Sequence, residues 1–504
     1  MTEIASIDPR TGTPVEVVAE ETGAQELDAL CRAAGEAAAP FAAAGRQWRA
    51  GLLRRIAAEL EADREAIVEL ADRETALGPT RLNGELTRTC YQFELFAQAV
   101  EEGSYTEAVI DHAGDTPMGP RPDLRRMLLP LGPVAVFGAS NFPLAFSVPG
   151  GDTAAALAAG CPVVIKAHPA HPATSLRTFA ALERAAAAEG APKGVLALVH
   201  GVRAGADLVA HPAIRAVGFT GSLRGGRALF DIASSRPDPI PFYGELGSVN
   251  PLVVAPAAAS ARGEEIAQGI TGSFTLGAGQ FCTKPGLVFL PEDEAGTSVA
   301  DAMAQAVGGL APGVLLSEQV RGGYEEGTRR LAGSAAVRSL AEGTAPEGTG
   351  WGAAVRLLAT SAADLTAETA EECFGPATLV VTYRDRDELA EALERVPGSL
   401  TATLIADDAD AEFTAALEPV LRDRAGRIVY NGYPTGVAVA WGQHHGGPWP
   451  ATTSALHTSV GITSIRRFLR PMTWQNAPQE LLPDELRDTP EHPLPRRVDG
   501  TLRV

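Results

Sequence analysis

Apolar residues recur at helical spacing through the first part of the chain. Between Ala24 and Leu77 the sequence is rich in alanine, and the stretch LLRRIAAELEADREAIVELA repeats apolar positions three and four residues apart. A second stretch of this kind covers Thr87 to Ala99. Residues 111–132 are instead rich in proline and glycine, which is typical of a connection or an extended arm. The pattern predicts a helical N-terminal region followed by an arm.

After residue 132, short apolar runs alternate with segments of helical character. Continuous apolar runs predict strands at 134–137, 162–167, 194–200 and 213–219. The segments between them predict helices, and we expect Asp152 to cap the first of these helices. Near-continuous apolar strands separated by helices indicate a parallel sheet that is covered on both faces. We therefore predict an α/β fold of the kind that binds dinucleotides.

Length, charge and cysteine content narrow the class of protein. A chain of 504 residues exceeds one ordinary core, so we expect two or three domains. A net charge of −20 argues against nucleic acid and anionic membranes as partners. The acidic start MTEIASIDPRTGTPVE does not resemble a signal peptide, and no apolar run approaches the roughly 18–20 residues of a membrane span. Five widely spaced cysteines without a CxxC pair predict a reducing cytoplasm, with neither a disulfide framework nor a metal site.

Ligands of parallel α/β sheets bind at the carboxyl ends of the strands, so these ends hold the first candidates. Asn141 follows the first strand, where its amide is either a hydrogen-bond donor or part of a turn. Lys166 ends the second strand and either reaches a ribose or phosphate or extends to solvent. The stretch FTGS at 219–222 precedes a helix, whose free N–H groups attract anions, although it is not the strict GxGxxG pattern.

Two further residues suggest chemistry. Glu245 stands between glycines and apolar residues at the end of a predicted strand, so we expect a poorly solvated carboxylate with a raised pKa that acts as a base. Cys282 lies in the stretch GQFCTKPG and is either a small buried hydrophobic residue or a nucleophile. Each of these residues, taken singly, also has a purely structural explanation.

Six motifs in a fixed order resemble those of the NAD(P)-dependent aldehyde dehydrogenase superfamily. They are Asn141 in SNFPL, Lys166 in VIKAHPAHP, FTGS at 219–222, Glu245 in ELG, Cys282 in GQFCT and Glu372 in EECFGP. The resemblance covers nearly the whole chain. It implies an aldehyde dehydrogenase-like fold with a Rossmann-type cofactor domain, an α/β catalytic domain and a small oligomerisation arm.

The resemblance also implies the domain boundaries and the assembly. The cofactor-binding domain would comprise residues 1–110 and 132–248, with a return at 441–469, and the catalytic domain residues 249–440. Residues 111–131 and 470–504 would form the oligomerisation arm. Because such arms pair across subunits in the family, we expect a homodimer or a homotetramer.

The catalytic roles follow from the same resemblance. The thiolate of Cys282 would attack a small-molecule aldehyde and form a thiohemiacetal. The side-chain amide of Asn141 and the backbone N–H of Cys282 would stabilise the oxyanion. After hydride transfer to the nicotinamide, Glu245 would activate the water that hydrolyses the thioester.

The resemblance implies a set of cofactor contacts as well. Lys166 would bind the adenosine ribose, Gly221 and Ser222 the pyrophosphate, and Glu372 the nicotinamide ribose, with Phe374 beside the ring. Many members that prefer NAD carry a glutamate three residues after the lysine, but here the stretch is KAHP, and His168 could face a 2′-phosphate together with Lys166. We therefore favour NADP, with NAD also accepted.

Departures from the common pattern point to a branch of the family. Ser140 replaces the usual tryptophan before Asn141, ELGSVNP replaces ELGGKSP, and the segment from His444 to Thr453 replaces the usual C-terminal loop. These features resemble the branch that contains 2-oxoglutarate semialdehyde dehydrogenases and an NADP-preferring fatty aldehyde dehydrogenase. A carboxylated semialdehyde needs a cation, for which Lys284 and Arg88 are candidates, although each is equally plausible as a surface charge.

Two interpretations of another class stay open. A CoA-acylating enzyme would resolve the thioester with CoA, and Glu245, which such relatives usually lack, argues against it. An inactive scaffold is disfavoured because Asn141, Glu245, Cys282 and Glu372 are all present.

Overall fold

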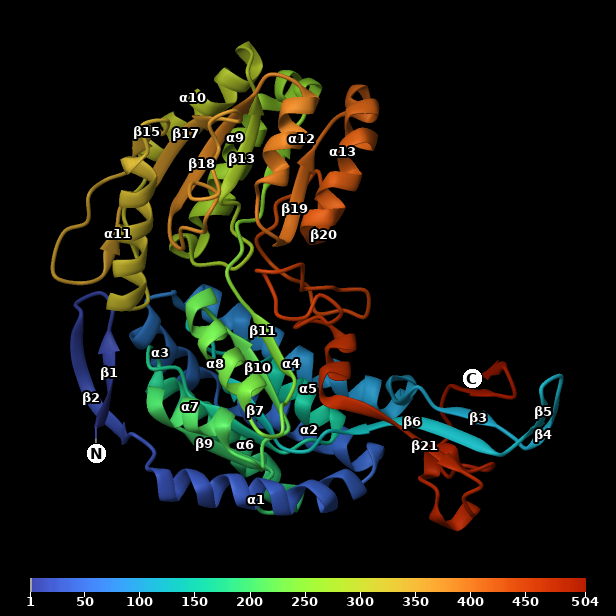
Figure 1. Cartoon of the computed structure of the whole chain (residues 1–504). Coiled ribbons are helices and arrows are strands. Elements are labelled where there is room, and N and C mark those ends of the chain that lie inside the picture. Colours follow the sequence, from blue (N-terminus) through green and yellow to red (C-terminus); the bar gives the residue numbers. More distant parts are fainter. Residues whose placement is uncertain (1) are drawn as a thin grey trace.

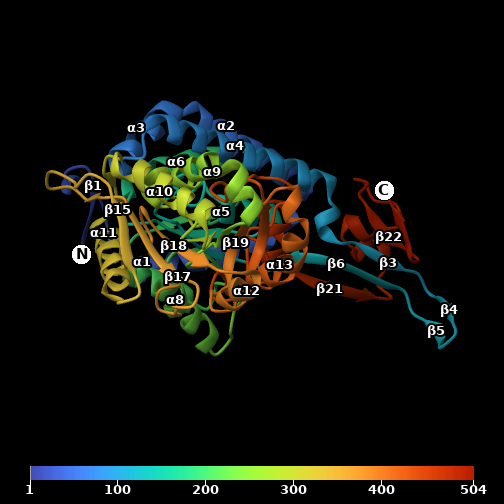
Figure 2. The ribbon, with the colours of Figure 1, turned by 90° about the horizontal axis from the view of Figure 1, so that it is seen from above.

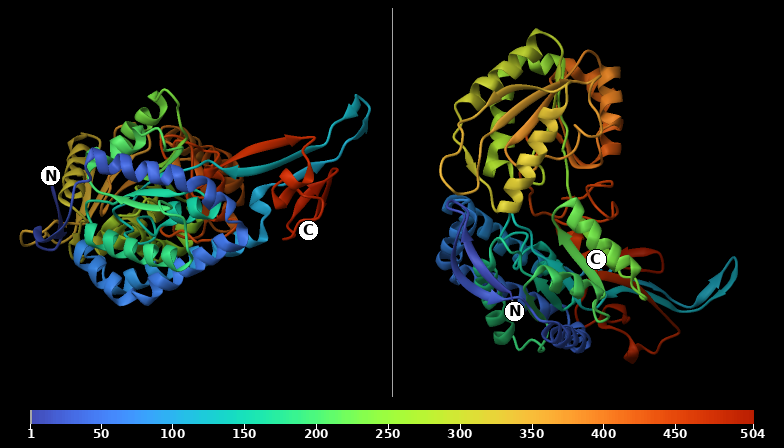
Figure 3. Two further views of the ribbon diagram at one scale, coloured as in Figure 1. Left: turned by 90° about the horizontal axis from the view of Figure 1, so that it is seen from below. Right: turned by 60° about the vertical axis from the view of Figure 1, so that its left-hand side comes forward.

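The structure is a computed structural model that describes residues 2–504, and its secondary structure forms two α/β bodies and a projecting arm (Figure 1). The first body contains the N-terminal helices and a five-stranded sheet, and the second contains a seven-stranded sheet. Figure 3 shows the two bodies stacked, with the chain passing between them twice. The first passage follows residue 245 and the second follows residue 430.

The N-terminal region is a hairpin followed by four helices. The hairpin pairs β1 (Glu3–Asp8) with β2 (Thr13–Glu20), and the helices are α1 (Ala24–Ala43), α2 (Arg46–Ala62), α3 (Arg64–Thr75) and α4 (Pro79–Glu102). The single helical stretch expected from Ala24 to Leu77 is therefore three helices. It breaks at Gly45, whose φ is 82°, and at Asp63, because non-helical backbone at these positions turns the chain.

The first sheet is entirely parallel and has the strand order β11-β10-β7-β8-β9. Its strands are β7 (Val134–Phe137), β8 (Val163–Lys166), β9 (Leu196–Val199), β10 (Ala216–Thr220) and β11 (Phe242–Glu245). The connecting helices are α5 (Gly151–Ala159), α6 (Pro172–Ala188), α7 (Val202–Ala210) and α8 (Leu223–Ser235). Val134 and Val136 pack into one hydrophobic cluster, while Ala135 and Phe137 pack into another, so both faces of the sheet are covered.

One local expectation in this sheet is wrong. Gly150, and not Asp152, is the N-cap residue of α5. Asp152 lies in the first turn of the helix, and its carboxylate accepts a hydrogen bond of 2.7 Å from Nη2 of Arg467. The carboxylate is thus engaged by a distant arginine, which the local pattern did not indicate.

The second sheet has seven strands, and its order is β15-β17-β18-β13-β12-β19-β20. These strands are β12 (Leu252–Val254), β13 (Leu287–Pro291), β15 (Arg338–Glu342), β17 (Arg356–Ser361), β18 (Ala377–Tyr383), β19 (Ser399–Ile405) and β20 (Ala425–Tyr430). All pairs are parallel except the edge pair of β15 with β17. Its helices are α9 (Pro256–Thr275), α10 (Glu294–Gly308), α11 (Glu318–Gly333), α12 (Arg386–Glu394) and α13 (Ala411–Arg424), and a small ladder joins β14 (Gly313–Val314) to β16 (Gly352–Ala353).

The arm combines segments from distant parts of the chain (Figure 2). Its sheet has the order β21-β6-β3-β22-β23, formed by β3 (Val109–Asp111), β6 (Leu124–Pro130), β21 (Leu469–Gln475), β22 (Arg496–Val498) and β23 (Thr501–Arg503). The hairpin of β4 (Gly114–Thr116) and β5 (Gly119–Arg121) projects beyond this sheet. The exact domain boundaries stay predictions. None of the helices formed by residues 2–504 has both the length and the apolar character that a membrane crossing requires.

Candidate active site

Three side chains from distant segments meet between the two bodies. Glu245 is the last residue of β11, and Cys282 lies in the loop between a short 3₁₀ helix (Leu276–Gly279) and β13. His445 belongs to the long segment that follows β20. His445 Nε2 lies 2.8 Å from Glu245 Oε1 and 3.5 Å from Cys282 Sγ. The sulfur, imidazole and carboxylate therefore form one cluster.

Hydrogen bonds from neighbouring residues hold each part of the cluster in place. Asn250 donates from Nδ2 to the carbonyl oxygens of Cys282 and Lys284, at 2.8 and 3.0 Å, and so holds the cysteine loop. The backbone N–H of His445 donates to Oγ1 of Thr458 at 2.7 Å. The hydroxyl of Ser459 donates to Glu245 Oε2, so both carboxylate oxygens have partners.

The charge state of Glu245 differs from the expectation drawn from the sequence. Burial favours a raised pKa, but the charge and hydrogen bond of His445 and the hydroxyl of Ser459 outweigh it, and the pKa of Glu245 is lowered. The predicted raised pKa is therefore wrong, because partners that the local sequence does not contain stabilise the carboxylate. Burial and the neighbouring Glu245 carboxylate raise the pKa of the Cys282 thiol well above its ordinary value.

Asn141 lies beside the cysteine loop. Its side-chain Nδ2 donates to the carbonyl oxygen of Gln280 at 3.0 Å. Its backbone carbonyl accepts from Nη2 of Arg81 at 2.6 Å. An amide nitrogen carries two hydrogens, so one donor is left for a ligand. The structure thus brings Asn141 to the same loop as the nucleophile candidate, while its role as an oxyanion donor stays a prediction.

The residues expected to bind the cofactor lie along one edge of the first sheet and on the facing loop. Lys166 ends β8, and burial lowers the pKa of its ammonium to about 8. His168 follows it, and its ring centroid lies 5.6 Å from that of His171. Ser222 is the N-cap residue of α8 and accepts from the N–H of Gly225 at 3.2 Å, with Gly221 directly before it.

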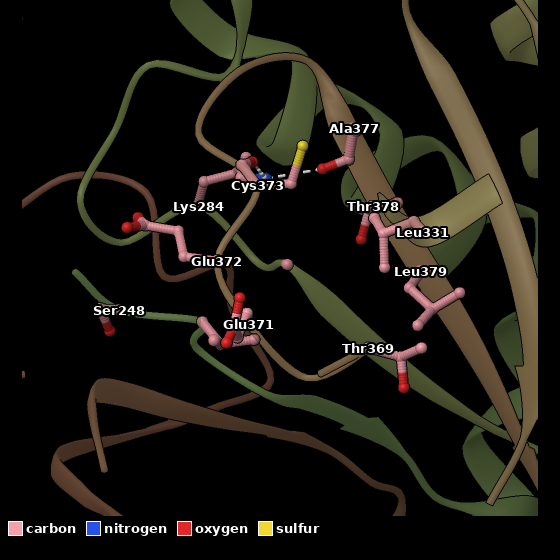
Figure 4. A pocket seen from close by; sticks show the side chains of 12 residues that line it. Ser248, Lys284, Leu331, Thr369, Glu371, Glu372, Cys373, Ala377, Thr378 and Leu379 are labelled. Carbon is pink, nitrogen blue, oxygen red and sulfur yellow. Dashed lines mark hydrogen bonds between the residues drawn. The ribbon is translucent and has the colours of Figure 1, made fainter. Parts of the chain in front are cut away.

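Glu372 and Phe374 belong to the loop that joins β17 to β18. Figure 4 shows the side chain of Glu372. Burial raises the pKa of Glu372 to about 7. The side chain lies against Gly247, where an added Cβ would approach Glu372 Oε2 to 2.7 Å. Gly247 thus leaves room for this carboxylate.

Comparison with known proteins decides the family. The sequence profile of the aldehyde dehydrogenase family matches residues 1–471. The chain belongs to the aldehyde dehydrogenase family. This confirms the resemblance drawn from the six motifs and the predicted fold class, and it makes the protein an NAD(P)-dependent aldehyde dehydrogenase family enzyme.

Curated relatives resemble this aldehyde dehydrogenase over almost its full length. The chain is 46% identical over 504 residues to the "Alpha-ketoglutaric semialdehyde dehydrogenase 2" of Azospirillum brasilense, covering 99% of this chain and 96% of that protein. It is 42% identical over 502 residues to the "Alpha-ketoglutaric semialdehyde dehydrogenase" of Acinetobacter baylyi, covering 99% and 95% of the two chains.

A solved structure shares the fold. The chain matches the 1-pyrroline-5-carboxylate dehydrogenase from Thermus with bound NAD with a TM-score of 0.80 and 22% identity, over 94% of this chain and 90% of that one. It also matches a putative aldehyde dehydrogenase from Burkholderia cenocepacia, with a TM-score of 0.78 and 22% identity over 94% and 97%. At this identity the likeness supports the fold.

The aldehyde dehydrogenase site has features that fit a nucleotide cofactor. His200 lies directly after β9, and its Nε2 is buried without a hydrogen-bond partner among residues 2–504. Because Val199 is the register partner of Lys166, the two strand ends place His200 beside the lysine. An unsatisfied buried nitrogen next to an ammonium suits the hydroxyls or phosphate of a nucleotide ribose.

Lys284, the first candidate cation for a substrate carboxylate, is engaged by backbone carbonyl groups. Its ammonium is fully buried and donates to the carbonyl oxygens of Cys373 and Ala377, at 2.8 and 2.6 Å (Figure 4). It therefore braces the loop that carries Glu372. The expectation that Lys284 binds substrate stays a prediction, and two of the three donors of its ammonium are already used by backbone carbonyls.

Arg88 is the other candidate cation, and it lies at the site. Its Cζ is 5.0 Å from the centre of the Phe146 ring, and that ring lies 6.5 Å from the ring of His445. Nη1 and Nη2 of Arg88 have no hydrogen-bond partner among residues 2–504. The guanidinium is thus close to the cluster and has free donors.

Sequence reasoning missed the role of His445, Ser459 and Asn250. His445 was noticed only as part of an unusual C-terminal segment. The signal that could have found it is a histidine pair where the family usually has a glycine-rich loop. The ligand atoms of Glu245, Cys282 and His445 all lie within 4.8 Å of one another, and the expectation that the site needs no metal stays a prediction.

Proposed function

We propose that this enzyme oxidises 2-oxoglutarate semialdehyde to 2-oxoglutarate with NAD(P), through a thiohemiacetal and a thioester on Cys282. The observation that carries the chemistry is the cluster of Cys282, His445 and Glu245 between the two bodies. The substrate is supported by the two relatives named for α-ketoglutaric semialdehyde, at 46% and 42% identity over 99% of the chain.

The first step needs a thiolate on Cys282. The side chain is partly exposed, so its proton can leave to water. The N–H at Nε2 of His445 has two acceptors in reach, the Glu245 carboxylate at 2.8 Å and the sulfur at 3.5 Å. Once the sulfur is negative, it is a better acceptor than the carboxylate. A hydrogen bond from the imidazole N–H then stabilises the thiolate and offsets the burial and the Glu245 charge that raise the pKa of the thiol.

The later steps use Asn141 and Glu245. The free N–H of the Asn141 amide and the backbone N–H of Cys282 stabilise the oxyanion that forms when the sulfur adds to the aldehyde. NAD(P)⁺, which Lys166, Ser222 and Glu372 would hold, would supply the hydride acceptor for oxidation of the thiohemiacetal. Glu245 is a carboxylate at neutral pH because its pKa is lowered, and it accepts a proton from the water that attacks the thioester.

The cofactor-binding residues we propose are Lys166, His168, His200, Gly221, Ser222, Glu372 and Phe374. The N-terminus of α8 with Ser222 suits the pyrophosphate, and Glu372 suits the nicotinamide ribose. We favour NADP, because no carboxylate follows Lys166 in the stretch KAHP and His168 and His200 flank the ammonium.

The exposed arm supports a homodimer or a dimer of dimers as the assembly. Met118 at its tip is 99% exposed and Leu502 is 60% exposed, which is unusual for apolar side chains that have no partner. All five cysteines are free thiols, which suits a reducing cytoplasm. Sedimentation at micromolar concentration tests the assembly, and a clean monomer of 52.3 kDa contradicts it.

A kinetic panel with both cofactors tests the proposed function. It comprises 2-oxoglutarate semialdehyde, succinate semialdehyde and unbranched aldehydes up to hexanal, each with and without CoA. We expect the highest kcat/KM for 2-oxoglutarate semialdehyde, independent of CoA. A preference for hexanal points to a fatty aldehyde dehydrogenase, and a requirement for CoA points to an acylating enzyme.

A further inference from the structure

Helix α4 presents a stripe of charged residues to the loop that carries Asn141. Arg81, Glu85 and Arg88 are spaced by four and three residues, so they share one face of the helix. Glu85 is buried, and its Oε1 accepts from the N–H groups of Leu144 and Ala145, at 2.8 and 2.9 Å. The carboxylate therefore ties the loop to the helix between the two guanidinium groups.

Three aromatic rings connect the two arginines to the catalytic cluster. The Cζ atom of Arg81 lies 4.9 Å from the centre of the Phe142 ring and 4.8 Å from that of Phe281. Phe142 directly follows Asn141, and Phe281 directly precedes Cys282. The ring of Phe142 lies 5.2 Å from that of Phe146, which Arg88 covers. Each guanidinium is thus one ring away from a residue of the site.

The arginines carry donors that the protein leaves unused. Among residues 2–504, Nη1 and Nη2 of Arg88 and Nη1 of Arg81 have no hydrogen-bond acceptor, although all three atoms are buried. Nη2 of Arg81 is engaged by the carbonyl of Asn141. Buried charged donors without acceptors destabilise the folded chain, and an anionic ligand would relieve this cost.

Among the cations near the site, Arg81 and Arg88 are the best candidates to bind a substrate carboxylate, because the other cations already donate to carbonyl groups. Arg81 and Arg88 both face Glu85, whose pKa is raised by burial, and Arg88 also faces Glu245 and Cys282. Arg427 lies near Cys282 as well, but its Nη1 already donates to the carbonyl of Gly436 and its Nη2 to that of Pro434. Lys284 donates to two carbonyls. Arg88 is the one of these cations that keeps both terminal nitrogens free.

We infer that Arg88 and Arg81 recognise the 2-oxo acid end of the substrate. The two free terminal nitrogens of Arg88 bind the carboxylate, as a guanidinium does in a bidentate pair. The single free donor of Arg81 binds the neighbouring 2-oxo oxygen. The inference rests on the proposed function and extends it, because it explains how the site would distinguish a 2-oxo semialdehyde from a simple semialdehyde and from an uncharged aldehyde.

The test compares variants on three aldehydes of similar length. These are 2-oxoglutarate semialdehyde, glutarate semialdehyde, which lacks the 2-oxo group, and pentanal, which lacks both groups. Arg88→Met should lower kcat/KM for both acids roughly tenfold to a hundredfold, mainly through KM, and change that for pentanal less than about twofold. Arg88→Lys should recover part of the loss, because it keeps the charge and loses the bidentate geometry.

Arg81→Met needs a ratio as its readout, because Arg81 also supports Asn141. Its kcat/KM should fall for all three aldehydes, and the ratio of 2-oxoglutarate semialdehyde to glutarate semialdehyde should fall further, by roughly fivefold or more. Arg32→Gln, on α1, where the side chain is 71% exposed and pairs with Asp28, is the control for loss of one positive charge and should leave all ratios unchanged.

The outcomes separate the inference from the proposed function. If the wild type prefers pentanal, both are overturned. If the wild type prefers 2-oxoglutarate semialdehyde and Arg88→Met keeps that preference, or loses all three activities equally, the proposed function stands and the inference is overturned. Should Arg88→Met not fold, Arg88→Lys decides, because it keeps the charge and loses the bidentate geometry: an unchanged ratio of kcat/KM for 2-oxoglutarate semialdehyde to that for pentanal would overturn the inference.

Discussion

His445 Nε2 lies 2.8 Å from Glu245 Oε1, although 200 residues separate the two in the sequence. The contact joins the segment after β20 to the end of β11, and it is completely buried. The same nitrogen lies 3.5 Å from Cys282 Sγ. One imidazole nitrogen therefore contacts both the carboxylate and the thiol.

Replacing His445 by glutamine should slow the reaction of Cys282 with iodoacetamide. The imidazole N–H that stabilises the thiolate is lost, and the apparent pKa of the thiol rises, so the alkylation rate at pH 7 should fall roughly tenfold. The rate is followed by mass spectrometry across pH 6 to 10. Alkylation with an unchanged pH profile would show that His445 does not act on the sulfur.

Replacing Cys282 by alanine should abolish turnover and leave the fold intact. Removal of a covalent nucleophile lowers kcat by roughly a thousandfold or more. Cys282 is partly exposed and its side chain is small, so the unfolding transition and the dissociation constant of the cofactor should change little. Cys90→Ala, a partly buried cysteine on α4, is the control and should keep full activity. Substantial turnover in Cys282→Ala would overturn the mechanism.

Replacing Glu245 by glutamine should slow thioester hydrolysis more than hydride transfer. Glutamine keeps the shape and loses the proton acceptor, so we expect a burst of roughly one reduced cofactor per active subunit, followed by slow turnover. Stopped-flow absorbance at the nicotinamide band measures both phases. Equal loss of burst and steady-state rate would assign Glu245 to the first chemical step.

The parallel sheet and the family resemblance could be predicted from the sequence because both have local signals. The apolar runs at 134–137 and 162–167 encode buried strands, and the confirmed family resemblance rests on short motifs. The strand ends then place Lys166 and Glu245 at the edges where ligands bind parallel sheets.

The charge state of the site could not be predicted, because it depends on contacts between distant segments. The pKa of Glu245 is set by His445 and Ser459, which come close only when the chain returns from the second sheet. The direction of the Lys284 side chain could not be predicted for a similar reason. Lys284 is two residues from Cys282 in sequence, but its side chain extends to the carbonyls of the Glu372 loop. The short separation of Lys284 and Cys282 in the sequence did not indicate where the lysine side chain would lie.

The last prediction concerns pH and the choice of cofactor. Burial lowers the pKa of Lys166 from 10.5 to about 8, so its ammonium is present below that pH and is lost above it. If it binds the 2′-phosphate of NADP⁺, the phosphate raises this pKa in the complex. Affinity for NADP⁺ should then fall by up to about tenfold per pH unit above pH 8, while that for NAD⁺ falls less.

Titration of each nucleotide against the protein between pH 6.5 and 9.5, followed by calorimetry, measures the two slopes. Lys166→Met should remove the difference between them, because the variant has no proton to lose. His168→Gln is the companion variant: it should keep the slope, since the pKa of His168 already lies well below its ordinary value and the ring is neutral throughout this range. Equal slopes for NADP⁺ and NAD⁺ in the wild type would show that Lys166 does not face the phosphate, and the preference for NADP would lose its basis.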